Sequence, residues 1–299
     1  MYPEILNYLP EDCLLFNEEM KKHTTFKIGG PADVIAMPRD EEDVRILISY
    51  CNKKHIPLFI LGMGSNLLVK DGGIRGIVMK LGDNLDEVEV IDDEIRAQAG
   101  VKLSTLSRIA AFHSLSGLEF AEGIPGSLGG AVVMNAGAYG GEIADVVVEV
   151  TAISLEGDIK KFKKEDIQWG YRHSVFQTNG YAVIAVRLKL IKGVREEIEH
   201  KMQELAKQRA EKQPLDMPSA GSTFRRPPGY FVGPMLEALG LKGYRIGGAM
   251  VSDKHAGFIV NTGNATAQDV LQLIDHIKQK AREGFGVELQ TEIRVVGED

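Results

Sequence analysis

The spacing of apolar residues predicts alternating strands and helices in the first part of the chain. A strand over residues 32–37 precedes a helix that Asp40 caps, with Asp43 three residues further on. A second strand, residues 57–61, follows this helix. Together they form a β-α-β pattern, which by itself indicates no particular chemistry. The apolar face of the helix is predicted to consist of Val44, Leu47, Ile48 and Cys51.

The middle of the chain is predicted to be rich in strands. A helix from about Ser104 interrupts them, and the tripeptide Glu156–Asp158 indicates a hairpin turn. The predicted strands cover residues 88–91, 95–99, 146–154, 159–162 and 181–190.

The last part of the chain is predicted to be more helical. A polar helix over residues 195–213, ended by Pro214, has the pattern of a connector with a solvated face. A short helix near residues 234–239 and a long one from Thr266 to Arg282 follow, with Gly284 as the expected C-terminal signal of the long one. A strand over residues 288–296 closes the chain. We divide the chain into residues 1–81, 82–194 and 195–299.

Composition narrows the class of protein. The chain has 299 residues, of which 44% are hydrophobic and 26% charged, as is typical of a globular protein with about two domains. A net charge of −7 gives no electrostatic footprint for nucleic acid or an anionic membrane. The N-terminus has no signal-peptide pattern, and no apolar run approaches the roughly 18 residues of a membrane span. Two cysteines are too few for a disulfide framework. We therefore expect a cytoplasmic protein.

A glycine-rich segment, residues 122–142, has the most unusual composition in the chain. Its sequence is EGIPGSLGGAVVMNAGAYGGE, with seven glycines. Such a segment is expected where the backbone needs positive φ or approaches another group closely. Successive bare N–H groups can then cradle phosphate oxygens. The alternative is a loop that crosses a tight domain junction.

A second segment, GMGSN at residues 62–66, has a similar character. It follows the strand at 57–61, and Ser65 and Asn66 add side-chain hydrogen bonds to a backbone cradle. The third glycine of a dinucleotide fingerprint and the Gly-Lys-Ser/Thr of a P-loop are both missing. Two such segments indicate a long ligand that contains a pyrophosphate.

Several polar side chains lie in tight loops and are candidates for chemistry. Arg172 has the planar fork that binds carboxylates or phosphates, although a structural salt bridge explains it equally well. Ser222 is placed to direct a hydroxyl into a cleft, yet most serines in such loops only bond backbone. Glu292 interrupts an apolar strand and could equally be solvated. Neither a metal-ligand spacing nor a Gly-x-Ser-x-Gly elbow is present, so we predict no metal site and no hydrolase triad.

The motifs GMGSN, GIPGSLGGAVVMNAGAYGGE, YRHSVF, AGSTFRRP and ELQTEIRVVG together resemble the UDP-N-acetylenolpyruvoylglucosamine reductases over nearly the whole length. The resemblance implies an α+β fold, with an FAD-binding module of the vanillyl-alcohol oxidase (PCMH) type in two subdomains, residues 1–81 and 82–194. Residues 195–299 would form a C-terminal α+β substrate-binding domain. It also implies peptidoglycan-precursor synthesis, with UDP-N-acetylglucosamine enolpyruvate and NADPH as substrates and no obligatory protein partner.

The resemblance assigns roles residue by residue. Ser222 corresponds to the proton donor, and Arg172 and Glu292 to residues that stabilise the intermediate. FAD is expected to bind noncovalently, because neither glycine segment contains His or Cys. The expected FAD-binding residues are Gly62, Gly64, Ser65, Asn66, Leu67, Gly123, Ile124, Pro125, Gly126, Ser127, Gly129, Gly130, Asn135 and Gly137.

One departure from the family pattern leaves the substrate contacts open. Some members insert a tyrosine lid between the arginine and serine motifs, whereas here residues 176–180 lead straight into the next strand, as in the shorter type. Two other functions are compatible with the pattern: an FAD oxidase of the same fold and a nucleotide-sugar sensor without turnover. The candidate substrate-binding residues are Tyr171, Arg225, Arg226, Lys254 and His255.

Overall fold

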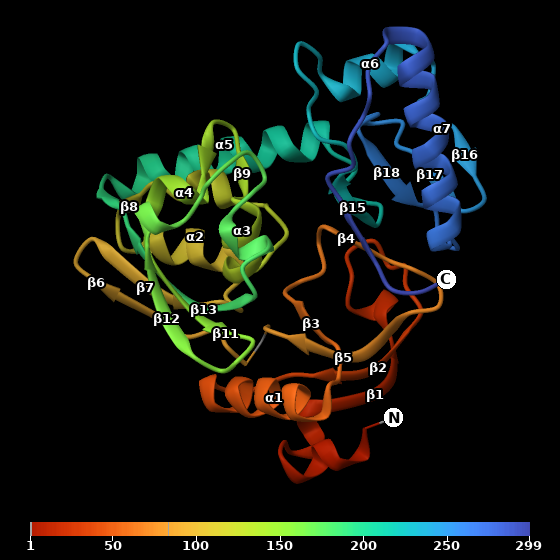
Figure 1. The fold of residues 1–299 in the computed structure, drawn as a ribbon. Helices are drawn as coiled ribbons and strands as arrows, with labels where there is room; N and C mark the ends of the chain where they lie inside the picture. Colours follow the sequence, from red (N-terminus) through yellow and green to blue (C-terminus); the bar gives the residue numbers. More distant parts are fainter. Residues whose placement is uncertain (1, 83) are drawn as a thin grey trace. The chain divides into compact units, whose positions relative to one another are not determined.

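The computed structural model describes residues 2–82 and 84–299 (Figure 1). These residues form two compact units that interleave along the chain, whereas the three predicted regions follow one another. Unit 1 consists of Met1–Phe16, Val34–Met63 and Gly76–Arg209. Unit 2 consists of Asn17–Asp33, Gly64–Arg75 and Ala210–Asp299.

A five-stranded sheet, antiparallel throughout, is the centre of unit 1 (Figure 1). All five strands were predicted from apolar spacing, and no observed bound differs from its prediction by more than one residue. The predicted hairpin is also confirmed, because the strands on either side of Glu156–Asp158 pair with each other. The sheet order is β12 (Ile159–Lys163), β11 (Val147–Ser154), β13 (Tyr181–Lys189), β7 (Glu94–Gln98) and β6 (Val88–Ile91).

Helices add a hydrophobic core to this sheet. They are α2 (Leu103–Phe112), α3 (Leu128–Met134) and α4 (Ile143–Val146). Helix α5 (Arg195–Lys212) instead packs through Ile198 and Met202 on Ala111 of α2. Helix α3 was not predicted, because the glycine-rich segment in which it lies has low intrinsic helix propensity. Tertiary packing overrides that propensity: Leu128, Ala131 and Val132 are buried in the core of unit 1.

The N-terminal part contributes a mixed sheet and a helix. The sheet order is β1 (Leu14–Glu19), β2 (Pro31–Ala36), β5 (Ile74–Lys80) and β3 (Leu58–Leu61), and β3 and β5 are parallel. Helix α1 (Glu41–Lys54) begins as predicted, since the Asp43 N–H donates to Asp40 Oδ1 at 2.8 Å. All four residues of its predicted apolar face are buried. Strands β1 and β5 were not predicted.

Unit 2 contains a four-stranded antiparallel sheet against which α7 (Ala267–Phe285) packs (Figure 1). Helix α7 begins as predicted, directly after Thr266, where Thr266 and Asp269 form a capping box. The predicted C-terminal signal was wrong: α7 continues through Gly284, against which Leu239 packs, and ends at the left-handed Gly286. The sheet order is β15 (Ser219–Ser222), β18 (Phe258–Asn261), β17 (Ala249–Val251) and β16 (Arg245–Ile246), and α6 (Val232–Ala238) lies in the same unit.

The closing strand is shorter than predicted. Only β19 (Arg294–Val296) is a strand, and it pairs in parallel with β4 (Leu67–Val69). Residues 288–293 bond to a loop instead: the Arg225 N–H donates to Gln290 O at 2.9 Å. Glu292 therefore lies outside any strand, so strand alternation does not describe its side chain.

None of the helices in the described part of the chain has the length and apolar composition of a membrane span.

Short elements complete both units. Two small antiparallel pairs are β8 (Leu115–Ser116) with β14 (Ile191–Lys192) and β9 (Gly137–Ala138) with β10 (Gly141–Glu142). The 3-10 turns are η1 (Pro3–Asn7), η2 (Glu11–Cys13), η3 (Met20–Lys22), η4 (Glu119–Ala121), η5 (Lys164–Asp166) and η6 (Val175–Gln177).

Candidate active site

The two glycine segments meet inside unit 1, at Gly62 and Ser127. A Cβ atom at Gly62 would lie 2.6 Å from Ser127 Oγ, so only glycine allows this approach. Beside them the surface is open, because a Cβ at Gly130 would meet only Ser127 Oγ, at 3.5 Å. Gly62 and Gly130, next to the buried Ser127, thus leave a surface almost free of side chains, which suits close approach by a phosphate chain such as the FAD diphosphate.

Fewer N–H groups of the glycine-rich segment are bare than its sequence predicted. The Leu128 N–H donates to Val101 O and the Gly129 N–H to Ala99 O, each at 2.8 Å. These bonds attach the segment to the chain that follows β7, and they explain why Ser127 is only 2% exposed. The segment is therefore a fixed part of unit 1, and only the N–H groups on its open side can bind phosphate oxygens.

The rest of the GMGSN segment belongs to unit 2, because the boundary between the units falls between Met63 and Gly64. Gly64 has φ +63°, and its carbonyl accepts a hydrogen bond from the Thr25 N–H at 3.2 Å. Ser65 is half-buried, and Leu67 is buried as the first residue of β4. In unit 2 this segment leads directly into the strand that pairs with β19.

Ser222 is exposed at the end of β15, where a bulge turns its side chain. The register of β15 with β18 shifts between Ser219 and Ser222, and Gly221 has φ +78° with no atom within 4 Å of a Cβ built on it. A glycine at positive φ inside such an irregularity commonly redirects the next side chain. The next residue, Thr223, is buried, and its Oγ1 accepts from the Ile259 N–H at 3.1 Å. The bulge thus separates an anchored threonine from an exposed serine.

Hydrogen bonds connect Thr223, the residue after Ser222, to Glu292, and Glu292 to the GMGSN segment, all within unit 2. The Glu292 N–H donates to Thr223 O at 2.8 Å, next to Ser222. Asn66 Nδ2 donates to Glu292 O at 3.2 Å, and the Arg294 N–H donates to Asn66 O at 3.0 Å. Three motifs that are far apart in sequence are therefore consecutive in one hydrogen-bonded arrangement.

Arg172 lies in a tight turn of unit 1. Gly170 and His173 exchange backbone hydrogen bonds of 3.0 and 3.1 Å, and Arg172 between them has φ +53°. Its Nη2 donates to Gly137 O in the glycine-rich segment at 2.9 Å, and its guanidinium lies over the Tyr171 ring, 5.1 Å from the centroid. The guanidinium is thus aligned by the segment predicted to bind FAD. Tyr171 itself is exposed.

Other predicted FAD-binding residues of this segment contact protein groups. Gly123 has φ +75° and packs against the buried Arg209 side chain, and Gly129 packs against Ala99. Gly126 O accepts from the Leu103 N–H at 3.0 Å. Ile124 packs on the core of unit 1, and Pro125 is exposed.

The environment of the Asn135 side chain differs from the FAD contact that its motif predicted. Its side chain is 0% exposed and makes hydrogen bonds within unit 1, so its amide is not presented to a ligand. The sequence reasoning also missed Gln177, whose Nε2 donates to Arg172 O at 2.9 Å. Only its place after the apolar pair Val175-Phe176 hinted at an inward-facing amide.

The predicted substrate-binding residues of unit 2 have different environments. Arg225 is half-buried, and its Nε is inaccessible to solvent and has no hydrogen-bond partner in the described part of the chain. Arg226 is exposed and stacks on Phe231, 3.8 Å from the ring centroid. Lys254 is exposed, and its Nζ donates to Ala210 O.

His255 is turned inward. Its Nδ1 accepts from the Gly257 N–H at 3.0 Å, and burial lowers the pKa of the imidazole. The ring packs edge-on against Phe258, 5.1 Å between centroids, and lies beside Gly233. His255 is thus a neutral hydrogen-bond acceptor and does not present a cation.

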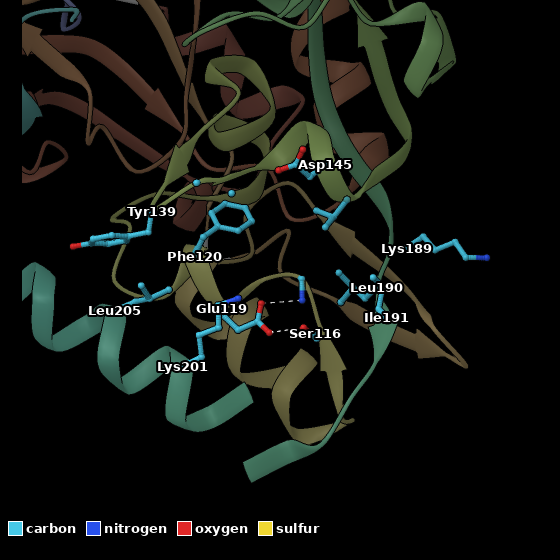
Figure 2. A pocket seen from close by; sticks show the side chains of 14 residues that line it. Ser116, Glu119, Phe120, Tyr139, Asp145, Lys189, Leu190, Ile191, Lys201 and Leu205 are labelled. Carbon is cyan, nitrogen blue, oxygen red and sulfur yellow. Dashed lines mark hydrogen bonds between the residues drawn. The ribbon is translucent and has the colours of Figure 1, made fainter. Parts of the chain in front are cut away.

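A pocket in unit 1 is separate from these residues. It has a volume of about 370 Å³ and lies between α5 and the end of the glycine-rich segment (Figure 2). Glu119 lines it with both carboxylate oxygens engaged, accepting from Ser116 Oγ at 2.6 Å and the Gly117 N–H at 2.9 Å. None of the predicted site residues lines this pocket. A second pocket, of about 410 Å³ in unit 2, has Lys254 in its wall.

Two family models match the sequence. An FAD-binding domain matches residues 32–163, and the C-terminal domain of UDP-N-acetylenolpyruvoylglucosamine reductase matches residues 213–296. A protein of that name from Syntrophomonas wolfei is 56% identical over 299 residues, which is 100% of both chains. The chain belongs to the UDP-N-acetylenolpyruvoylglucosamine reductase family. Its membership confirms the predicted resemblance and, with the FAD-binding match, the predicted cofactor.

Other members of the reductase family are also similar to this chain over nearly its whole length. One from Caldanaerobacter subterraneus is 53% identical over 290 residues, covering 97% of this chain and 96% of its own. The crystal structure of the Thermus caldophilus reductase has a TM-score of 0.81 at 36% identity and covers 94% of this chain and 97% of its own. An alkyldihydroxyacetonephosphate synthase, 17% identical with a TM-score of 0.50 over 64% of this chain and 41% of its own, shares the fold alone.

Proposed function

We propose that this protein catalyses the NADPH-dependent reduction of UDP-N-acetylglucosamine enolpyruvate to UDP-N-acetylmuramate, a step of peptidoglycan precursor synthesis. The observation that carries the proposal is the hydrogen-bonded succession of Thr223, Glu292 and Asn66 in unit 2. It attaches the backbone beside Ser222 and the backbone of Glu292 to a segment expected to contact FAD, in a chain whose family is named for this reaction.

FAD, if bound and reduced by NADPH, would supply a hydride to one carbon of the substrate double bond. The electron pair of that bond then moves towards the substrate carboxylate, and the second carbon takes a proton. In our proposal Arg172 stabilises the developing charge through its planar fork, the kind of preorganised contribution that lowers a barrier most. Its alignment by Gly137 O, at 2.9 Å, supports this role.

Ser222 is the proposed proton donor to the second carbon. A serine hydroxyl is a weak acid, but the carbon it protonates is carbanion-like and strongly basic, so geometry decides whether transfer occurs. The bulge at Gly221 and the anchored Thr223 support this role, because they leave the Ser222 hydroxyl exposed on a fixed backbone. Glu292 is the proposed hydrogen-bond partner of the same enolate.

For the cofactor we propose the open surface at Gly62 and Gly130 as the diphosphate cradle. Flavin binding is proposed to be noncovalent: both cysteines are free and buried, and burial raises the pKa of Cys51 to about 12. Such inert thiols are also what a reducing cytoplasm maintains, and we propose that location.

For the substrate we propose Arg225 as the first contact with its diphosphate, because a buried guanidinium N–H without a partner is costly unless an anion accepts from it. Arg226, Lys254 and Tyr171 are exposed and are proposed as outer contacts.

The test is Ser222→Ala, with the two halves of the reaction followed separately by stopped-flow absorbance of the flavin. Reduction by NADPH should be unchanged, because that half needs no proton from Ser222. Reoxidation by the enolpyruvyl sugar nucleotide should slow by about 10²–10⁴-fold. Ser219→Ala, on the same strand, is the matched control and should change neither rate. Equal slowing of both halves would contradict a proton donor and would indicate that Ser222 shapes a shared pocket.

A further inference from the structure

The turn that carries Arg172 has a backbone conformation that needs support from its surroundings. Arg172 lies at φ +53°, in the left-handed region, where any residue with a Cβ atom is disfavoured. Such a conformation persists only when neighbouring groups determine it, and it is often found at functional sites. The side chains that support this turn therefore act on Arg172 without touching a ligand.

Asn135 provides support from the end of α3. Its Nδ2 donates to Gly170 O, the first residue of the turn, at 3.1 Å, and its Oδ1 accepts from the Ala144 N–H at 3.0 Å. A carbonyl only accepts and an N–H only donates, so the amide orientation follows from its two partners. Asn135 is 0% exposed and has φ +43°, a conformation that asparagine tolerates better than most residues.

Two further side chains attach the segment after the turn to the same helix end. Ser174 Oγ donates to Val133 O at 2.9 Å. Gln177 Nε2 is within 3.0 Å of Val133 O and within 2.9 Å of Arg172 O. The last carbonyls of a helix lack partners within it, so these bonds satisfy α3 and fix the turn together. Asn135 is the contact on the N-terminal side of Arg172.

We infer that Asn135 is a positioning residue for Arg172. By holding Gly170 O, it fixes the turn against the glycine-rich segment, so that the Arg172 guanidinium meets Gly137 O with its planar fork correctly oriented. The inference rests on the proposed function, in which Arg172 stabilises charge on the substrate. It replaces the cofactor contact that the motif predicted for the Asn135 side chain.

Two variants of the holoenzyme test the inference. Asn135→Gly keeps the left-handed backbone and removes both side-chain bonds. Asn135→Asp keeps the acceptor for the Ala144 N–H but turns an oxygen towards Gly170 O. In both, we expect flavin reduction by NADPH within about twofold of wild type. Reoxidation by the enolpyruvyl nucleotide should slow by about 10- to 100-fold, the scale of a misplacement of about 1 Å.

The matched control is Ser154→Ala. Ser154 is also buried, at 4% exposure, and its Oγ accepts from the Glu156 and Asp158 N–H groups at 3.1 and 3.2 Å in a separate hairpin of unit 1. It should lose thermal stability without selective loss of the reoxidation rate. If Asn135→Gly merely matches this control in both rates, Asn135 is a structural residue only and the inference is overturned.

Two readouts distinguish positioning from other roles. The reoxidation rate of Asn135→Asp relative to wild type should rise as pH falls, because a protonated carboxyl group can again donate to Gly170 O. In an Arg172→Lys background, Asn135→Gly should add less than about threefold further slowing, since the arginine fork is already gone. Loss of FAD from Asn135→Gly together with equal slowing of both halves would overturn the inference in favour of a cofactor contact.

Hydrogen exchange keeps this test separate from that of the proposed function. The His173 N–H donates to Gly170 O, so its exchange in the holoenzyme should accelerate in Asn135→Gly and not in Ser154→Ala. If wild-type flavin is not reoxidised by the enolpyruvyl nucleotide, the proposed function fails. The exchange of His173 still decides whether Asn135 holds the turn, and unchanged exchange overturns that claim.

Discussion

Replacing Gly62 with alanine should damage the junction of the two glycine segments, by an amount that the structure allows us to estimate. The new Cβ would lie 2.6 Å from Ser127 Oγ, and Ser127 is only 2% exposed, so a neighbour must move. Overpacking of this kind costs about 1–3 kcal/mol. The lower backbone entropy of alanine in the unfolded chain returns about 0.4–1 kcal/mol. We expect Gly62→Ala to lower the unfolding free energy by roughly 0.5–2 kcal/mol.

A second substitution should remove this cost. In Ser127→Ala the clashing oxygen is gone, and the next atom, Ser127 Cβ, lies 3.9 Å from the new methyl group, an ordinary contact. Gly62→Ala should then be neutral or stabilising, with a coupling energy of about 1–3 kcal/mol between the two positions. Urea unfolding of the four FAD-free proteins measures this coupling without any change in cofactor contacts.

FAD titration of the same four proteins should show whether the junction matters for binding, because each 1.4 kcal/mol lost is about tenfold in dissociation constant. Gly130→Ala is the control: its Cβ would lie 3.5 Å from Ser127 Oγ, and alanine favours the helix by up to about 1 kcal/mol over glycine. A coupling energy under about 0.5 kcal/mol would refute the contact between Gly62 and Ser127.

Three further predictions concern catalysis, the cofactor and acid stability. Arg172→Lys keeps the charge but loses the planar fork, so turnover should fall steeply; a rate within about threefold of wild type, roughly 0.6 kcal/mol, would show that the fork is unnecessary. Mild denaturation should release free FAD into the filtrate, whereas flavin that remains with the chain would exclude noncovalent binding. Arg39 donates hydrogen bonds to the Asp43 carboxylate, with 2.8 Å between Nε and Oδ2, and these bonds hold the pKa of Asp43 below its usual range. This stabilisation is present above a pH of about 4 and disappears as pH falls through the lower folded pKa, so Asp43→Asn should flatten the decline of unfolding free energy between about pH 4 and pH 2.

Local pattern predicted those elements whose signals are local. Helix α1 could be placed because Asp40 and Asp43 form its cap and its apolar residues recur at helical spacing. Helix α3 could not, since its glycines disfavour a helix and only the burial of Leu128 and Val132 compensates. The end of α7 was misplaced for a similar reason: Gly284 is selected by the packing of Leu239 and not by a turn.

In the candidate site, too, local sequence predicted some features, and others depend on contacts between distant residues. The motifs and the family resemblance identified Ser222, Arg172 and Glu292 as candidates, but their supports are non-local. Asn66 and Glu292 are 226 residues apart, and no spacing rule connects them. Asn135 lies in a motif that indicates phosphate binding, and only its burial and its two backbone partners indicate a different role. Sequence therefore identified chemistry more readily than it identified what holds that chemistry in place.

The interleaving of the two units has a consequence for biosynthesis. Segments 17–33 and 64–75 of unit 2 are translated long before segment 210–299, with which they share a core that includes Phe26, Ile28 and Leu68. At about 5–20 residues per second, the 226 residues from Asn66 to Glu292 take roughly 10 to 45 s to synthesise. During that time β4 has no β19 to pair with, and its apolar residues must be protected by the ribosome, by chaperones or by transient contacts. A nascent chain arrested before β19 should therefore be bound by chaperones and cut by proteases within these early segments, even where unit 1 has already folded.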